Sequence, residues 1–563
     1  MVAFSLVPLI LAGVAPLTAW AAPGFTTTSS IQGTPVLPTI SIGLLCKLPL
    51  LEKICTRVMS PSAQVSTPIG VAQGVSDGSG SGAHRFAVRY ASAARWASSK
   101  VVTKWEFPNG ATNASALPLA CPQPGVDPSM YTEDCLSMIL YVPTSFTPSS
   151  TASTLLWIHG GSFIAGSATD PGLDGSNLAV ATNSIVAVMQ YRLGALGFMA
   201  PSGATNLAVK DTINALNFLN KVLPSFGGEA CKITLAGQSS GAGMIRALLA
   251  TPSASSLFQS AIMQSDPNNY GFLNMSTQVA LQSSFNNFTG CAASDKACQT
   301  SLSLAAILNS QGTLSSSAPS INPSTGIAEP IRPVRDGSLI TTPLDLTAPF
   351  PSATKPILLS NVKNEAGPTI YGMFPASITS SFFLPVSQSI LGDERTAVVS
   401  ASAFYPLTGV TDSRVPLETL GTDYMWRCPT WSFARLWAAH GGQVHVGVYF
   451  EGATYPANDG LAFCDGGGVC HQDDIYIVFG TTPGPTPAQA ALTAEVQARY
   501  KAFLATGSPN GVGLSPWSAA TASDVHSHQL GGQPSPSGEV PVGACDPSFW
   551  GDKVEYDYQV YGI

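Results

Sequence analysis

Charged side chains are scarce in this sequence. Asp, Glu, Lys and Arg supply only 10% of its 563 residues, whereas soluble domains typically carry about a quarter. The formal net charge is −8, and no run of like charges stands out. The chain therefore lacks the basic footprint of a nucleic-acid-binding protein and the charged tail of many interaction proteins. Its solubility has to come from hydroxyl and amide groups, with attached sugars as a further source.

Long hydrophobic runs are also missing. An apolar core over residues 4–14 is shorter than the roughly 20 residues that a membrane-spanning helix needs, and a small-x-small site, Ala-Trp-Ala, follows at 19–21. We therefore expect a cleaved signal peptide over residues 1–21, secretion to the extracellular space and no membrane anchor. Residues 22–63, rich in Pro, Thr and Ser, are expected to form a low-order extension, and residues 64–563 one large domain.

What the chain does have is a Gly-Gln-Ser-Ser-Gly stretch at 237–241. A short apolar strand at 233–236 precedes it and a helix is expected to begin near residue 242. A Gly-x-Ser-x-Gly turn of this kind forces its central serine onto a strained elbow between strand and helix. Ser239 is then a candidate nucleophile, although Gly and Ser are so common here that the same stretch alone is typical of an ordinary turn.

A second motif lies upstream, where an expected buried strand at 154–158 runs into His-Gly-Gly-Ser-Phe at 159–163. A tight glycine turn at this point can direct backbone N–H groups toward a developing oxyanion, and the N–H of Ser240 would complete the cradle. Without the serine elbow, the same residues would indicate a plain glycine turn.

A base and an acid complete the chemistry that such a serine needs. Of seven histidines, His471 stands out because it follows the short segment between Cys464 and Cys470 and precedes an apolar element. Glu365 lies in the loop beyond an expected strand at 355–361. Spacing alone does not separate either residue from a solvated surface side chain.

Along the chain, the order oxyanion turn, serine elbow, glutamate and histidine resembles the type-B carboxylesterase/lipase family, the cholinesterase-like branch of the α/β-hydrolases, and in particular its secreted, fungal-type esterases. The similarity runs from about residue 64 to the end of the chain. Further stretches match the family in order, namely Glu-Asp-Cys-Leu at 133–136, Tyr-Arg-Leu-Gly at 191–194, Phe-Gly-Gly at 226–228, Pro-Val-Arg-Asp-Gly at 333–337, Asn-Glu-Ala-Gly at 364–367 and Val-Phe-Gly at 478–480.

The resemblance implies Ser239 as nucleophile, His471 as general base and then acid, and Glu365 as the residue that orients the imidazole. It implies oxyanion donors at the backbone N–H groups of Gly161, Ser162 and Ser240. Ser162 and Ser240 replace the family's usual glycine and alanine, but both keep their N–H groups. No cofactor and no metal site are expected.

The resemblance also implies an α/β-hydrolase fold, with a mostly parallel central sheet, helices on both faces and large insertions over the site. The alternation of apolar runs with helical segments favours the same class. Strands are expected at 154–158, 184–191, 233–236, 260–265, 355–361 and 444–450, helices at 207–222 and 492–505, and insertions at 266–350 and 366–425.

The expected substrates are accessible, neutral esters, either small molecules or lipids. Only 13 residues lie between Cys121 and Cys135, too few for a large lid, and Gln238 replaces a glutamate that would favour cationic substrates. Candidate residues for an acyl or aryl pocket are Phe163, Tyr270, Phe272, Phe374, Phe382 and Phe383. Alternatives remain open: a lipase or sterol esterase, an aryl (cinnamoyl) esterase, an acyltransferase, or a non-catalytic cholinesterase-like binding protein.

Eleven cysteines in a secreted chain are expected mostly to pair. The resemblance implies the pairs Cys121–Cys135, Cys291–Cys298 and Cys428–Cys545, and proximity in the sequence adds Cys46–Cys55 and Cys464–Cys470. Cys231 is left over and is expected to be a buried, inert thiol. Possible N-glycan acceptors are Asn113, Asn274 and Asn287.

Overall fold

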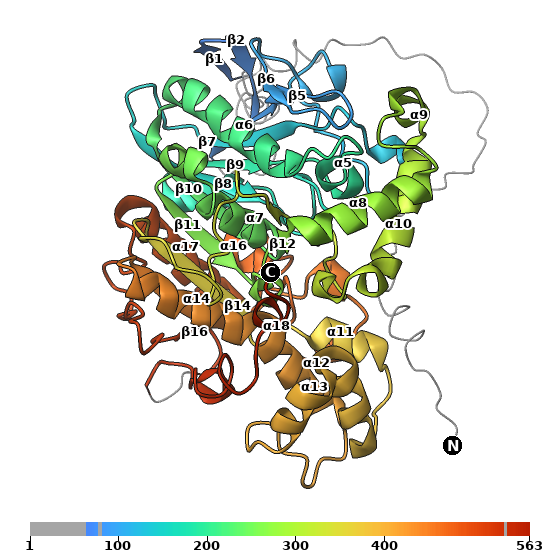
Figure 1. The fold of residues 1–563 in the computed structure, drawn as a ribbon. Coiled ribbons are helices and arrows are strands. Elements are labelled where there is room, and N and C mark those ends of the chain that lie inside the picture. Colours follow the sequence, from blue (N-terminus) through green and yellow to red (C-terminus); the bar gives the residue numbers. More distant parts are fainter. Residues whose placement is uncertain (1–62, 77–81, 534–536) are drawn as a thin grey trace, which may run out of the picture.

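A ten-stranded sheet forms the centre of the protein (Figure 1). The computed structural model describes residues 63–76, 82–533 and 537–563. Seven neighbouring strands of the sheet are parallel, in the order β16-β15-β14-β11-β10-β8-β9. They are β8 (Ala152–Ile158), β9 (Ile185–Met189), β10 (Gly228–Gln238), β11 (Ser260–Gln264), β14 (Ile357–Val362), β15 (Val444–Tyr449) and β16 (His528–Leu530).

The other side of the sheet is antiparallel. Beyond β9 lie β7 (Ser137–Pro143), β4 (Ala83–Arg89) and β3 (Val75–Ser76), each antiparallel to its neighbour. Three two-stranded sheets lie outside the main one: β1 (Gln64–Thr67) with β2 (Gly70–Gln73), β5 (Ala91–Ser92) with β6 (Lys100–Val101), and β12 (Leu273–Asn274) with β13 (Val334–Arg335). The predicted sheet, mostly parallel, is confirmed, and the antiparallel edge is an addition to it.

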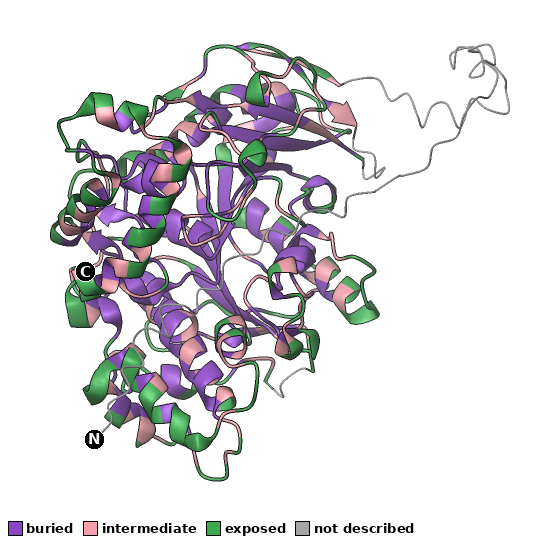
Figure 2. Ribbon diagram, turned by 90° about the vertical axis from the view of Figure 1, so that its right-hand side faces the viewer, coloured by how far each residue is buried: buried purple, intermediate pink, exposed green. Residues whose placement is uncertain are grey.

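Both faces of the sheet are buried. Successive residues of a strand point to opposite faces, so neighbouring residues pack into different clusters. Along β8, Leu156 and Ile158 pack into one hydrophobic cluster, and Leu155 and Trp157 pack into another. The first cluster contains α6 (Leu207–Val222), α7 (Ser240–Leu249) and α14 (Cys428–Ala439); the second contains α4 (Ser176–Thr182), α16 (Ile475–Phe479) and α17 (Pro487–Thr506). Figure 2 shows the strands in the buried colour and the exposed residues mainly on outer helices and loops.

The remaining helices belong mainly to two long segments between strands of the sheet. The first segment contains α8 (Met275–Thr289), α9 (Lys296–Ser301) and α10 (Leu304–Ile321), and the second contains α11 (Gly367–Met373), α12 (Phe383–Ser400) and α13 (Arg414–Thr422) (Figure 1). Shorter helices are α5 (Gly194–Phe198), α15 (Ala462–Asp465) and, at the end of the chain, α18 (Asp557–Tyr561). The two segments correspond to the insertions expected at 266–350 and 366–425.

Some of the features expected near the N-terminus lie outside the residues that the structure describes. The expected signal peptide at 1–21, nearly all of the extension at 22–63 and the Cys46–Cys55 pair lie outside the described residues. Within the described ranges, no helix combines the length and the apolar character that crossing a membrane requires.

Four disulfides lie within the described residues: Cys121–Cys135, Cys291–Cys298, Cys428–Cys545 and Cys464–Cys470. All four are pairs that the sequence analysis expects. The expectation for Cys231 is wrong, because its thiol is exposed and donates a hydrogen bond to Glu229 at 3.1 Å. The pairing of β10 with β8 is irregular between Gly228 and Ile233, and residues 231 and 232 within this irregularity are open to solvent.

Candidate active site

Ser239 occupies a strained turn between a strand and a helix. The strand β10 ends at Gln238, the helix α7 begins at Ser240, and Ser239 between them has φ 56° and ψ −128°. A non-glycine residue with positive φ is costly and is held only where the surrounding structure enforces it. Gly241 is part of that enforcement, since a Cβ atom there would lie 2.1 Å from the carbonyl oxygen of Ile158. The serine side chain is thus presented at the carboxyl edge of the sheet.

The glycine turn after β8 lies against this serine. A Cβ atom on Gly160 would lie 2.8 Å from the carbonyl oxygen of Gln238 and 3.1 Å from the Ser239 Cβ, so glycine allows this close approach. Gly161 has φ 110° and Ser162 has φ 53°. Among the described residues, no acceptor is found for the N–H groups of Gly161 and Ser162. Ser240 is the first residue of α7, and a first-turn N–H has no acceptor within its own helix. These N–H groups are available to an anionic oxygen.

His159 supports the turn. Its ring stacks on Tyr191 with centroids 4.7 Å apart, and the Tyr191 hydroxyl donates to the carbonyl oxygen of His159 at 3.0 Å. Burial lowers the pKa of His159 to about 4, so its imidazole is neutral near pH 7. The backbone of Gly166 lies directly against the ring. A Cβ atom on this glycine would be only 2.3 Å from Nδ1 of His159.

Glu365 and His471 lie together beside the turn. Nδ1 of His471 is 2.5 Å from Oε2 of Glu365, and the other oxygen of Glu365 accepts a hydrogen bond from the Val362 N–H at 2.9 Å. Glu365 is only 1% exposed. A buried carboxylate held in this way fixes the orientation and tautomer of the imidazole.

The two loops that carry this pair are joined through their backbones. The N–H of Asn364 donates to the carbonyl of Val469 at 2.9 Å, and the N–H of Val469 donates to Oδ1 of Asn364 at 3.2 Å. The Cys464–Cys470 disulfide closes the loop just before His471, and the side chain of Asn458 donates to the His471 carbonyl at 2.8 Å. Residues next to Glu365 and next to His471 in the sequence therefore hold the two loops in fixed positions relative to each other.

The electrostatic surroundings favour a protonated imidazole. Burial lowers the pKa of His471, but the negative charge of Glu365 and the hydrogen bond to it raise that pKa, and the net result lies above the ordinary value of 6.5. Asp474 and Glu329 add to the increase. Both carboxyls are buried, and burial raises the pKa of each to about 7. The site is built to stabilise positive charge on the imidazole.

Nε2 of His471 contacts Gln238 in this structure. It lies 3.2 Å from the side-chain nitrogen of Gln238, and no hydrogen bond joins the described imidazole to the Ser239 hydroxyl. Gln238 is fully buried, and its side-chain oxygen lies 2.9 Å from the point where a Gly160 Cβ would stand. The Ser239 Cβ is 3.1 Å from the same point. The amide of Gln238 therefore lies close to both the imidazole and the serine.

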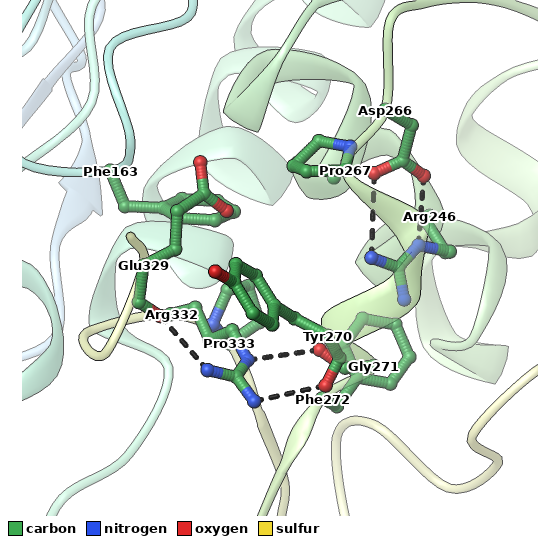
Figure 3. Close-up of a pocket in the computed structure, with 11 residues that line it drawn as sticks. Phe163, Arg246, Asp266, Pro267, Tyr270, Gly271, Phe272, Glu329, Arg332 and Pro333 are labelled. Atoms are coloured by element: carbon green, nitrogen blue, oxygen red, sulfur yellow. Dashed lines mark hydrogen bonds and ion pairs between the residues drawn. The ribbon is translucent and has the colours of Figure 1, made fainter. Parts of the chain in front are cut away.

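Three of the six aromatic candidates line a small pocket next to this spot. Phe163, Tyr270 and Phe272 are among its walls (Figure 3). Phe382 is instead exposed, Phe383 is fully buried in α12, and Phe374 is not part of the pocket. Sequence reasoning missed Glu329 in the same pocket and Asp474 behind His471. The position of Glu329, four residues before the Pro-Val-Arg-Asp-Gly stretch, was its only signal.

The other candidate residues lie away from the site. Asn113 and Asn287 are exposed, whereas Asn274 is half-buried and caps α8 by accepting the Thr277 N–H at 2.9 Å.

Within the described residues, Asp423, Cys428 and Cys545 are close enough to suggest a metal site. The two cysteines form a disulfide, so their sulfur atoms are not free to bind an ion.

Comparisons with known proteins identify the family of this chain. Residues 61–541 match the carboxylesterase family. The cAMP-regulated D2 protein of Dictyostelium discoideum is 31% identical over 316 residues, which cover 54% of this chain and 57% of that protein. A para-nitrobenzyl esterase of Bacillus subtilis (strain 168) is 39% identical over 165 residues, 27% of this chain and 33% of that enzyme. The chain thus matches little more than half of the first relative's length and a third of the second's.

A solved structure shows the same fold over a longer stretch. A PNB esterase aligns with a TM-score of 0.68 at 24% identity and covers 84% of this chain and 96% of that one. This likeness confirms the predicted α/β-hydrolase fold. Since the family match extends over most of the sequence and includes every element of the site, the chain belongs to the carboxylesterase family.

Proposed function

We propose that the protein is a serine carboxylic-ester hydrolase that works through Ser239, His471 and Glu365. The observation that carries this proposal is the 2.5 Å contact between His471 and the buried Glu365, on loops that end beside the Ser239 elbow. The strained φ of Ser239 and the unpartnered N–H groups of the glycine turn support it. Each of these features would be an unexplained cost in a protein without acyl-transfer chemistry.

The proposed reaction has two halves. The Ser239 hydroxyl attacks the ester carbonyl carbon while Nε2 of His471 takes its proton, and the carbonyl oxygen becomes an anion held by the N–H groups of Gly161, Ser162 and Ser240. The protonated imidazole then gives its proton to the leaving alcohol as the C–O bond breaks. Water repeats the sequence on the acyl-enzyme and releases the acid.

The first step requires a small local change. Nε2 of His471 has to turn from the amide of Gln238 to the Ser239 hydroxyl. Catalytic hydrogen bonds are often long or misaligned in unliganded enzymes and tighten when substrate binds. Glu365 and its hydrogen bond from Val362 hold the far side of the ring during this change.

The proposed substrates are neutral, accessible esters. Gln238 puts no charge beside the imidazole, and the loop between Cys121 and Cys135 is short. One relative is named a para-nitrobenzyl esterase, and a para-nitrobenzyl ester is a neutral ester. We further propose that the protein is secreted, because its disulfides suit an oxidising compartment. In this proposal residues 1–21 are the signal peptide, residues 22–63 an extension and residues 64–563 the hydrolase domain.

Replacement of the nucleophile tests the proposal. We expect Ser239→Ala to lose at least about 10³-fold in kcat for p-nitrophenyl acetate, because the substitution removes the hydroxyl that forms the acyl-enzyme. Its thermal unfolding temperature and circular dichroism spectrum should match those of the unaltered protein.

Covalent labelling separates an enzyme from a binding protein with the same fold. A fluorophosphonate probe should label the unaltered protein and leave Ser239→Ala unlabelled, with the adduct mapped to residue 239 by mass spectrometry. Equal labelling of both proteins, or undiminished turnover by the variant, would rule out Ser239 as the nucleophile.

A further inference from the structure

A small pocket adjoins the proposed active site and contains an unusual carboxyl group. Figure 3 shows residues from four parts of the chain around it: the turn after β8, helix α7, the segment that follows β11, and residues 329–333. The walls include Phe163, Tyr270 and Phe272. Its free space is about that of one water molecule. Such a pocket admits a small group and no long chain.

Glu329 is buried in this pocket without a partner. The residue is only 5% exposed, and among the described residues its carboxylate makes no hydrogen bond and no ion pair. In Figure 3 the carboxyl lies on the Phe163 side of the pocket, away from the Arg332 guanidinium, and no dashed line reaches it. Buried polar groups are nearly always hydrogen-bonded, so this carboxyl is poised to bind something.

The charged neighbours of Glu329 are bound elsewhere. Arg332 donates to five backbone carbonyls, those of Gly271, Thr325, Glu329, Tyr270 and Ser324, at 2.5–3.0 Å. Arg246 pairs with Asp266 at 2.8 Å. The guanidinium groups therefore cannot turn to Glu329 without breaking these contacts.

The charge balance of the pocket indicates a neutral ligand. Its walls hold two guanidinium groups, Arg246 and Arg332, and two carboxyls, Asp266 and Glu329. Burial raises the pKa of Glu329 to about 7, although Arg332 acts in the opposite direction. A cation would add an unbalanced charge to this set, whereas a neutral hydroxyl would supply the missing hydrogen bond at no electrostatic cost.

The position of the pocket assigns it to the acyl side of a substrate. Phe163 directly follows the oxyanion turn, and Gly243 lies one turn into α7, where its N–H donates to the Ser239 carbonyl at 3.0 Å. A Cβ on Gly243 would lie 3.1 Å from the Phe163 ring, so the two walls nearly touch. None of the lining residues comes from the loops of Glu365 and His471. Because the imidazole protonates the leaving alcohol in the proposed reaction, the alcohol lies on the side of those loops and the acyl group lies on the other.

We propose that Glu329 determines specificity by accepting a hydrogen bond from a hydroxyl group on a short acyl chain. The proposal rests on the proposed esterase function. A hydroxyl on the second or third carbon of the acyl group would occupy the small space and satisfy the carboxyl. An apolar acyl group would leave the carboxyl buried and unpaired, and sites built around a polar group discriminate strongly against substrates that lack its partner.

Matched pairs of ethyl esters test this proposal with the full-length protein. The pairs are lactate with propionate, and 3-hydroxybutyrate with butyrate, and acid release is followed by pH-stat titration. Each kcat/KM is divided by the rate constant of hydroxide-catalysed hydrolysis, which removes the higher intrinsic reactivity of hydroxy esters. We expect the unaltered protein to prefer the hydroxy ester at least about tenfold in one pair.

Variants of Glu329 identify the source of the preference. Glu329→Met, which is apolar and of similar length, should lose the preference while it still hydrolyses the apolar esters, and Glu329→Gln should keep most of it. Glu394→Met, on the exposed face of α12, is the matched control and should behave like the unaltered protein.

The outcomes separate this inference from the esterase function. Turnover of all four esters without a hydroxy preference overturns the role of Glu329, as does a preference that survives in Glu329→Met; both results leave the esterase function standing. Should Glu329→Met fail to fold, the ratios of the unaltered protein still decide. Absence of all turnover overturns both proposals.

Discussion

At the scale of single residues, the site is organised around the charge on one imidazole. His471 contacts Glu365 through Nδ1 and the neutral amide of Gln238 through Nε2. Its pKa lies above 6.5, because the effect of the nearby carboxylates outweighs the effect of burial. The neutral ring is the form that can take the serine proton, so we expect kcat/KM to rise with pH through a midpoint above about 6.5.

The substitution Gln238→Glu should shift this midpoint further. It would put a carboxylate within about 3 Å of Nε2 and favour the protonated ring, so that the pKa of His471 rises and the rise in kcat/KM moves to higher pH. The measurement is kcat/KM for p-nitrophenyl acetate between about pH 5 and 9. Glu394→Gln, which removes an exposed charge from α12, should leave the profile in place. A midpoint that stays fixed or falls in Gln238→Glu contradicts our account of the site.

Sequence reasoning reached some of these residues and not others. Ser239, Glu365 and His471 were predicted because their local motifs occur in family order, and the structure brings Glu365 and His471 into contact. Glu329 carries no such pattern, and its burial depends on the way the segment after β11 folds over it, which a lone glutamate does not reveal. The prediction for Cys231 was wrong for a similar reason, because the irregular start of β10 exposes residues that a regular buried strand would cover.

At the scale of elements, the close contact between β8 and α7 makes the serine turn possible. Gly237 and Gly241 both face the carbonyl oxygen of Ile158, with hypothetical Cβ atoms 2.7 and 2.1 Å from it. Six of the seven parallel strands were predicted, because each is a short apolar run; β16, only three residues long, was not. The antiparallel strands β4 and β7 were not expected, since they pair across some fifty intervening residues and carry no chemical motif.

Gly241→Ala tests this contact. The new methyl group would collide with backbone, which cannot move aside as a side chain can, so we expect a loss of about 1–3 kcal/mol in the free energy of unfolding and a fall in kcat. Chemical denaturation and p-nitrophenyl acetate hydrolysis provide the two measurements. The control is Gly312→Ala in α10, where no atom lies within 4 Å of the new Cβ and a gain of roughly 0.5–1 kcal/mol is expected. Similar stability of the two variants would show that the close approach is not needed.

At the scale of the whole molecule, disulfides tie distant parts of the chain together. Cys428 and Cys545 are fully buried and are separated by 117 positions in the sequence, so their bond connects the start of α14 to the C-terminal region. The Cys291–Cys298 bond spans only seven positions. A longer closed loop restricts the unfolded chain more strongly, and the stabilisation should differ accordingly.

The double variant Cys428→Ala/Cys545→Ala should therefore lose roughly 2–5 kcal/mol of stability. We expect a clearly smaller loss for Cys291→Ala/Cys298→Ala. Thermal unfolding monitored by circular dichroism, without reductant, compares the two with the unaltered protein. An equal decrease in Tm for both would mean that loop length does not govern the effect.

The backbone link between Asn364 and Val469 also bears on how the protein would fail when heated. Because the carboxylate loop and the imidazole loop share this link, fraying of either one disturbs the register of both. Heat inactivation should then run as a single step, without a stage in which the imidazole is in place but its carboxylate is not. Amide hydrogen exchange should find both loops opening at the same rate.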